Sequence, residues 1–267
     1  MIFIGEKING TRNVIKKAIL DRDAAYIQEI AKSQAEAGAD YLDINAGTEP
    51  ERETEDLLWL IETVQWVVET PICIDSSTAS AIQEAIKIVK QTPMINSING
   101  DPRRLEEFLP FIKEKGCPVI ALALDESKSG MPKTIEERMM VLERIFKATR
   151  EMGIADDKIF IDPLIMAVAT DQKAGTLAFD CICTIRATYP EAHITGGLSN
   201  ISFGLPNRAL INRTFLTLAV AAGMDSAVVN PSNVELIESL YATELLLGRD
   251  KFCRKYTTAS KTGFIKK

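Results

Sequence analysis

The chain alternates about eight times between a short apolar run and a longer amphipathic stretch. The apolar run YLDIN at residues 41–45 is typical of a buried strand, and the stripe Ile27, Ile30, Ala31 predicts a helix over residues 23–37. Parallel sheets of α/β proteins alternate in this way, and eight such units that close on themselves form a (β/α)8 TIM barrel. The main rival is an open doubly wound sheet. It usually carries a GxGxxG turn after its first strand, which GEKING at residues 5–10 does not provide.

The length of 267 residues suits one barrel domain over residues 1–267, because no Pro/Gly/Ser-rich linker divides the chain. Residues 252–267 carry several lysines and no clear apolar period. We therefore expect a loose C-terminal tail there.

Composition excludes several classes of protein. A net charge of -6 argues against nucleic-acid binding, and no run approaches the roughly 18 apolar residues of a membrane helix. The N-terminal MIFIGEKING becomes polar too early for a signal peptide. Five cysteines without a CxxC motif predict reduced core thiols in a cytoplasmic protein rather than a zinc or iron–sulfur site.

His193 is the only histidine. Catalytic schemes that need a histidine pair, a histidine-rich metal site or a Ser-His-Asp triad with a spare histidine are therefore nearly excluded. We expect His193 to be a packing residue beside a strand.

Polar side chains follow most of the expected strands at the point where each strand ends. They are Glu6, Asn9, Asp43, Asn45, Asp75, Asn96, Asn99, Asp162, Ser199, Asn200 and Asn230. A single Asp after a strand is usually a helix cap. Seven strands that end in this way are harder to attribute to capping, and in a barrel all of them point to one mouth.

The chemistry of these side chains bears on the ligand. Carboxylates and amides with few Lys or Arg suit a neutral, flat heterocycle, and a 2-amino-4-oxo-pyrimidine edge offers two donors to one carboxylate. A divalent cation held by Glu6, Asp75 and Asp162 is the competing interpretation, since hard cations also bind carboxylates. Sequence spacing does not separate the two.

The segment GGLSNISFGLPNRALINR at residues 196–213 joins an expected strand to a helix that opens at about Asn207. Taken alone, its glycines indicate only a tight turn whose backbone is satisfied by Ser199 and Asn200. Because this segment, like the other strand ends, carries polar side chains directly after an expected strand, we expect it to form one wall of the mouth.

At these segments the chain resembles the pterin-binding methyltransferases that move a methyl group from methyltetrahydrofolate to a corrinoid protein. The motifs are IGEKING, YLDINAG, CIDSS, MINSINGD, IDPLI, GLSNIS and NRALINRTFL, and together they span almost the whole chain. The family fold is a (β/α)8 barrel. Dihydropteroate synthase and the folate domain of methionine synthase share that fold and a related pocket.

The resemblance implies a role for each matching residue. Asp75, Asn96 and Asp162 would bind the pyrimidine edge, and Asn200 would meet N5, the nitrogen that carries the methyl group. Asn200, with Asp162 or Asp75, forms the expected catalytic set. The other implied pocket residues are Gly197, Ser199, Glu6, Asn9, Asp43, Asn45 and Arg208, the last near the glutamate tail or the partner. Phe203 stands where some family members have Gln, so no polar role is expected for it.

The resemblance further implies methyltetrahydrofolate or tetrahydrofolate as substrate, a corrinoid carried by a partner protein, and no bound metal. It implies a homodimer in anaerobic one-carbon metabolism. Three alternatives stay open: a dihydropteroate-synthase-like condensing enzyme, a metal-dependent barrel lyase, and a non-enzymatic folate-binding protein.

Overall fold

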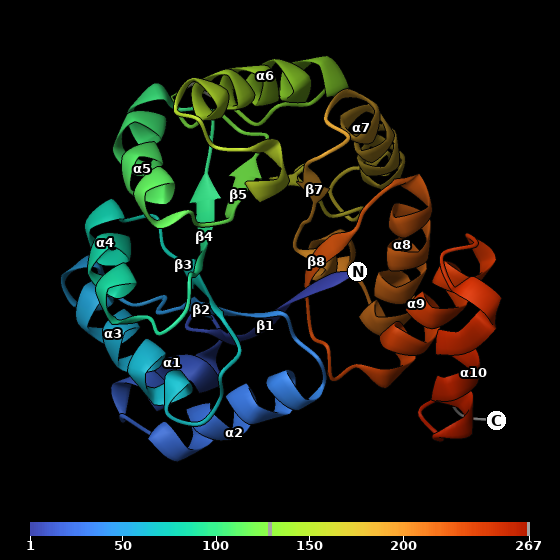
Figure 1. Ribbon diagram of the computed structural model, residues 1–267, viewed down its shortest axis with the longest axis horizontal. Coiled ribbons are helices and arrows are strands. Elements are labelled where there is room, and N and C mark those ends of the chain that lie inside the picture. The colour runs from blue at the N-terminus through green and yellow to red at the C-terminus, as the bar shows by residue number, and fades with distance from the viewer. Residues whose placement is uncertain (128–129, 266–267) are drawn as a thin grey trace.

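The computed structural model describes residues 1–127 and 130–265. Within them, eight parallel strands form one sheet (Figure 1). The strands are β1 (Ile2–Asn9), β2 (Tyr41–Asn45), β3 (Ile72–Asp75), β4 (Met94–Ile98), β5 (Val119–Leu122), β6 (Ile159–Asp162), β7 (His193–Ile194) and β8 (Ser226–Val229).

The sheet closes into a barrel. Its order is β7-β6-β5-β4-β3-β2-β1-β8, so each strand from β1 to β6 pairs with the next one along the chain, and β8 pairs with β1. The two ends meet at a parallel bridge between Gly197 and Val228, where Val228 N donates to Gly196 O at 3.0 Å. We call this β7–β8 junction the seam. The expected (β/α)8 barrel is confirmed.

Helices surround the strands (Figure 1). They are α1 (Asn13–Leu20), α2 (Ala24–Glu36), α3 (Pro50–Gln65), α4 (Ala79–Ile88), α5 (Pro102–Lys115), α6 (Ile135–Glu151), α7 (Ala174–Thr188), α8 (Arg208–Ala222), α9 (Val234–Leu246) and α10 (Arg254–Lys261). Short 3-10 turns are η1 (Asp156–Lys158), η2 (Leu198–Ser202) and η3 (Lys251–Cys253). Each barrel helix buries an apolar stripe, such as Leu57, Leu60 and Val64 of α3.

Two apolar cores hold the barrel. The larger one fills the space between strands and helices. The smaller one lies inside the barrel and consists of Ile4, Cys73, Met94, Ile120 and Phe160. These residues lie on the strands before the polar carboxyl ends. The barrel interior is therefore apolar along the strands and polar where the strands end.

Several helix boundaries follow the local signals in the sequence. Asp101 caps α5 by accepting from Arg103 N at 2.9 Å, and α5 ends at Gly116 in the left-handed conformation (φ 65°). Thr134 and Glu137 form a capping box at the start of α6.

The structure corrects two expectations at the termini. Strand β1 continues to Asn9 through an irregularity between Gly5 and Ile8, and α1 follows it. Where the sequence indicated a loose tail, residues 254–261 form α10. The cause is Asp250, whose carboxylate accepts from Lys255 N and Tyr256 N at 2.9 Å and so satisfies the free amides of the first turn.

Three of the five cysteines are buried, namely Cys73, Cys117 and Cys181. Cys183 and Cys253 are exposed, so the expectation of core thiols is wrong for these two, which lie on outer helix surfaces or turns. No helix in residues 1–127 or 130–265 is long and apolar enough to cross a membrane.

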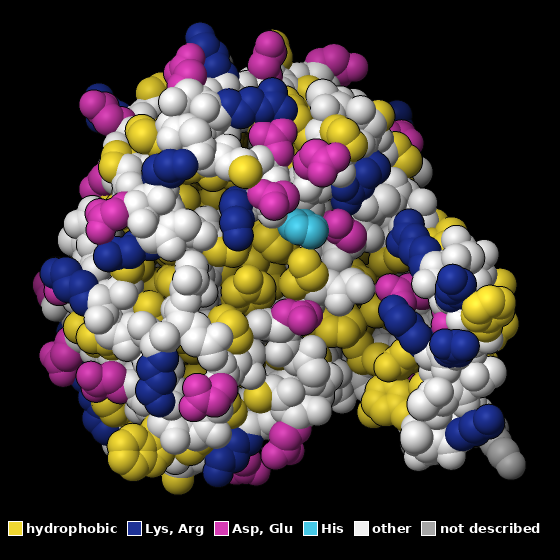
Figure 2. Space-filling view, viewed as in Figure 1, with side chains coloured by type: hydrophobic (Ala, Val, Ile, Leu, Met, Phe, Trp, Pro, Cys, Tyr) yellow, Lys and Arg dark blue, Asp and Glu magenta, His cyan; other side chains and the backbone are white. Residues whose placement is uncertain are grey.

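Figure 2 shows the face at the amino ends of the strands, with hydrophobic side chains at its centre and His193 beside them. His193 stacks on Phe160, with ring centroids 4.5 Å apart, and its Nδ1 lies 3.0 Å from Asp225 Oδ2. It therefore packs as expected, and it also makes a polar contact at the seam.

Candidate active site

A cavity of about 710 Å³ opens at the carboxyl ends of the strands. We call it the mouth. The predicted site residues that line it are Glu6, Asp43, Asp75, Asn96, Asp162, Gly197, Ser199, Asn200 and Arg208. Asn9 also lines it, whereas Asn45, Asn99 and Asn230 do not. The side chains of Asn99 and Asn230 accept from Asp101 N and Ser232 N, so they stabilise the turns that lead into α5 and α9.

The residues expected at the pyrimidine edge lie on β3, β4 and β6. Asp75 and Asn96 are register partners on neighbouring strands, and Asp162 ends β6. Behind them, Asn96 Nδ2 donates to Asp43 Oδ1 at 3.1 Å. The Asn45 side chain hydrogen-bonds to Asp75 from outside the cavity lining. Asn45, expected among the pocket residues, thus lies behind Asp75 and does not line the cavity.

These carboxyl groups are hard to ionise in the free protein. Burial raises the pKa of Asp43 to about 6, against hydrogen bonds from Asn96 and Cys73. Burial and the Asp43 carboxylate raise the pKa of Asp75 well above its usual range. Burial also raises the pKa of Asp162 to about 6, although the Leu164 amide and Arg138 oppose it. Donors on a ligand would favour the ionised forms, so part of the ligand's binding energy would be needed to ionise them.

The buried Asp43 makes stability depend on pH. Its pKa is 3.8 as a free carboxyl and about 6 in the fold, so the unfolding free energy falls as pH rises from about 4 through 6. Asp43→Asn removes this titration. The free energy of unfolding of Asp43→Asn, measured relative to that of wild type, should therefore increase between pH 4 and pH 7.5, by at most ~3 kcal/mol.

Urea unfolding at the two pH values measures this difference. Asp180→Asn on the exposed face of α7 is the matched control and should show no such growth. If the unfolding free energies of Asp43→Asn and wild type differ by the same amount at both pH values, the prediction is wrong.

Asp162 is held in place by a turn and by a buried arginine. Its Oδ1 accepts from Leu164 N at 2.8 Å. Arg138 of α6 is only 2% exposed, and its Nη1 donates to Pro163 O at 2.6 Å. The positive charge of Arg138 keeps the pKa of Asp162 from rising further. Arg138 was not predicted from the sequence. Its position three and four residues before Val141 and Leu142 does place a basic residue in an apolar stripe.

The loop after β7 presents Asn200 to the mouth from η2. A Cβ on Gly197 would lie 3.0 Å from Asn200 Nδ2, so glycine allows the side chain to fold back over the loop. Arg208 braces this turn by donating from Nη2 to Ser199 O at 2.7 Å and from Nε to Ser202 Oγ at 3.0 Å. Ser199 Oγ in turn donates to Glu6 Oε2 at 3.4 Å.

Several lining residues were not predicted. These are Lys7, Thr11, Arg12, Ala209, Asn212 and Asn233, together with the apolar floor residues Ile120 and Val228. Asn212 follows Arg208 by one helical turn, a spacing that could have indicated it. Its Oδ1 is buried without a hydrogen-bond partner, so it can accept from a ligand.

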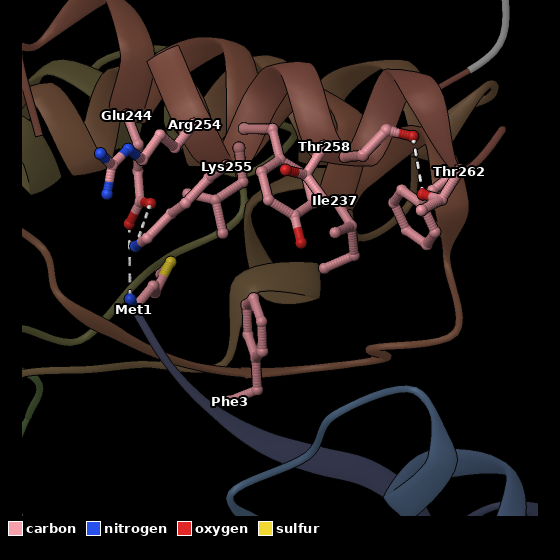
Figure 3. A pocket seen from close by; sticks show the side chains of 12 residues that line it. Met1, Phe3, Ile237, Glu244, Arg254, Lys255, Thr258 and Thr262 are labelled. Carbon is pink, nitrogen blue, oxygen red and sulfur yellow. Dashed lines mark hydrogen bonds and ion pairs between the residues drawn. The ribbon is translucent and has the colours of Figure 1, made fainter. Parts of the chain in front are cut away.

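A second cavity of about 680 Å³ lies where the N-terminus meets α9 and α10 (Figure 3). Its walls include Phe3, Ile237 and Leu240, and Glu244 accepts from the Met1 ammonium and Lys255 Nζ at 3.4 Å each. It contains none of the carboxylates and amides of the strand ends. Across residues 1–127 and 130–265, no cluster of His, Cys, Asp and Glu has a geometry for a metal ion.

The fold and the mouth together define a (β/α)8 barrel whose carboxylates and amides meet at the carboxyl ends of the strands. The chain belongs to the pterin binding enzyme family, which it matches over residues 5–230. It is 40% identical to the methylcorrinoid:tetrahydrofolate methyltransferase of Eubacterium limosum, over 99% of this chain and 98% of that protein. The family resemblance seen in the sequence is confirmed.

More distant relatives agree with this membership. The methionine synthase of Mycobacterium leprae is 32% identical over 88% of this chain, and the match covers 20% of that longer protein. A dihydropteroate synthase from Coxiella burnetii, solved with pteroic acid, has a TM-score of 0.69 at 20% identity and covers 92% of this chain and 93% of its own. At that identity the likeness concerns the fold alone.

Proposed function

We propose that this protein is a methyltransferase that moves a methyl group between N5-methyltetrahydrofolate and the Co(I) corrinoid of a partner protein. The observation that carries the proposal is the convergence of Asp75, Asn96, Asp162 and Asn200 on one open mouth. The name of the Eubacterium limosum relative, 40% identical over nearly the whole chain, supports it.

One wall of the mouth binds the pyrimidine edge of the pterin, and the opposite wall lies beside N5. Asp75 and Asp162 accept from the exocyclic amine and the ring NH, and Asn96 pairs with the remaining pyrimidine atoms. This orientation leaves N5 toward Asn200 on the opposite wall. The apolar floor formed by Ile120 and Val228 contacts the ring.

Methyl transfer from a tertiary amine needs a better leaving group. In the forward direction a proton from solvent first adds to N5. The cobalt electron pair then attacks the methyl carbon, the C–N5 bond breaks, and its electron pair becomes the lone pair of N5, which keeps the added proton as N5–H. The Asn200 amide, with an ordered water, hydrogen-bonds to N5 as its charge changes, and Asp162 reaches the same loop by accepting from Gly197 N. The reverse direction, described by the relative's name, uses the same contacts.

The direct test is an anaerobic optical assay with methyltetrahydrofolate and Co(I) cobalamin. We expect Co(I) absorption to fall and methyl-Co(III) absorption to grow in proportion to enzyme. The absence of any spectral change with free or protein-bound corrinoid would refute the proposal. Tight folate binding without transfer would instead indicate a folate-binding protein.

One observation favours a second candidate, a dihydropteroate-synthase-like condensation. Lys7, Arg12 and Arg208 line the mouth and could hold a pterin diphosphate. Incubation with pterin diphosphate and p-aminobenzoate distinguishes the two functions, and we expect no dihydropteroate.

The remaining expectations are part of the same proposal. The enzyme works in the cytoplasm as a homodimer and binds no metal of its own. Exposed Leu218, Leu246 and Leu247 on and beside α8 and α9 supply apolar surface for a dimer. Light scattering on the purified protein measures its mass, and unchanged activity after chelation would separate it from a metal-dependent lyase.

A further inference from the structure

One arginine outside the mouth is bonded to the two chain segments that follow Asp75 and Asn96. Arg104 lies in the first turn of α5 and does not line the cavity. Asp75 on β3 and Asn96 on β4 do line it, and they are register partners on neighbouring strands. Any group that fixes both segments therefore also fixes how these two side chains lie relative to each other.

The guanidinium of this arginine makes four hydrogen bonds to three backbone carbonyls. Its Nε and Nη2 both donate to Ser97 O, at 2.9 and 2.6 Å. Its Nη1 donates to Ser77 O at 2.8 Å, and Nη2 also donates to Ser76 O at 3.3 Å. Ser97 directly follows Asn96, and Ser76 directly follows Asp75. A planar fork with several fixed donors can hold two chain segments in one relation, whereas an ammonium group is a single point of charge.

The surroundings hold both the guanidinium and the segment after β3. Arg104 Cζ lies 4.3 Å from the ring centroid of Phe108, a fully buried residue one turn further along α5. From α3, Glu53 accepts from Ser76 Oγ at 2.5 Å and from Thr78 Oγ1 at 2.7 Å. The segment after β3 is thus bonded to two helices, and Arg104 is the side chain that also joins it to the segment after β4.

We propose that Arg104 is a positioning residue for the pterin edge, which sets the spacing of Asp75 and Asn96 so that one ring can bond to both. This inference rests on the proposed function, because it needs a flat ligand that spans the two side chains. The charge of Arg104 acts in the same sense. Burial and the Asp43 carboxylate raise the pKa of Asp75, whereas Arg104 lowers it and so favours the ionised acceptor.

The test measures equilibrium binding of methyltetrahydrofolate to Arg104→Met, which keeps a long side chain against Phe108 but removes every donor. We expect the Kd to rise about 10- to 100-fold, the usual cost at metal sites of losing a group that orients a binding side chain. Arg104→Lys should bind no more than about threefold tighter than Arg104→Met, because an ammonium group keeps the charge without the fork. Arg103→Met, at the adjacent exposed arginine outside the mouth, should bind as wild type does.

Two double-mutant cycles separate positioning of the edge from a general loss of structure. In the Asp75→Asn background, the effect of Arg104→Met on the Kd should shrink to less than about threefold, because the pair of side chains that Arg104 aligns is already broken. In the Asn200→Ala background, on the opposite wall of the mouth, the same substitution should keep its full effect. A merely structural role would give equal effects in both backgrounds.

The outcomes distinguish this inference from the proposed function. If Arg104→Met or Arg104→Lys binds the folate as tightly as wild type, or if the effect of Arg104→Met is undiminished in Asp75→Asn, the inference is wrong. Methyl transfer by wild type in the optical assay would then leave the proposed function standing. If wild type neither binds methyltetrahydrofolate nor transfers its methyl group, the proposed function is wrong and the inference falls with it.

Discussion

We expect Asn200→Ala to slow single-turnover methyl transfer about 10²-fold, while weakening folate binding less than tenfold. Asn200 is exposed and lines the mouth. In the proposed mechanism it contacts N5 as the charge on that nitrogen changes, so its loss affects the transition state more than the ground state. Anaerobic stopped-flow absorbance of Co(I) measures the rate, and equilibrium titration measures the affinity.

Asn13→Ala is the matched control, since Asn13 is exposed on α1 and does not line the mouth. It should change neither quantity. If Asn200→Ala binds folate and transfers the methyl group at the wild-type rate, Asn200 takes no part in the catalytic step. Asp162 or Asp75, acting with water, would then be the groups left to assist N5.

The second large effect concerns affinity. Asp75→Asn replaces an acceptor for two pterin donors by an amide that presents its own NH2, and charged hydrogen bonds are each worth about 1.5–3 kcal/mol. We expect the Kd for methyltetrahydrofolate to rise about 10²-fold in a titration at pH 7.5. Wild-type affinity should also fall as pH drops through about 6, the pKa of Asp162, because a protonated carboxyl loses an acceptor site.

Asp180→Asn controls for the loss of one negative charge far from the mouth. If Asp75→Asn binds the folate as tightly as wild type, the carboxylate does not hold the pyrimidine edge. An unchanged affinity in wild type from pH 5 to pH 8 would mean that the ligand does not need Asp162 ionised.

Much of the barrel could be predicted from the sequence because its strands and helices are locally consistent. The run at residues 41–45 is β2, and the stripe around Ile27 lies on α2. The extension of β1 to Asn9 could not be predicted, since polar Glu6 and Lys7 lack an apolar period. They lie in the irregularity between Gly5 and Ile8, and Ile8 and Asn9 then resume the pairing with β2.

The mouth was predictable for a topological reason. Side chains at the carboxyl ends of parallel strands meet at one end of a barrel, so Asp75, Asn96 and Asp162 could be grouped without coordinates. Arg138 could not, because its approach to Asp162 depends on how α6 packs against β6. Nor could Lys7 and Arg12, because their positions at the mouth depend on the extra length of β1.

The seam bears on the movement of the catalytic loop. Strand β7 has only two residues, and Asp225 supplements its pairing by accepting from Ile194 N at 2.8 Å and contacting His193. Across the seam, Asp225 N donates to Ile194 O at 3.3 Å and Val228 N donates to Gly196 O at 3.0 Å. Because this junction is short, local opening there costs less free energy than in the longer strand pairs. Such an opening would carry Asn200 away from the substrate. In the proposed complex, substitutions at Asp225 would thus change the exchange of bound folate from the end of the barrel opposite the mouth.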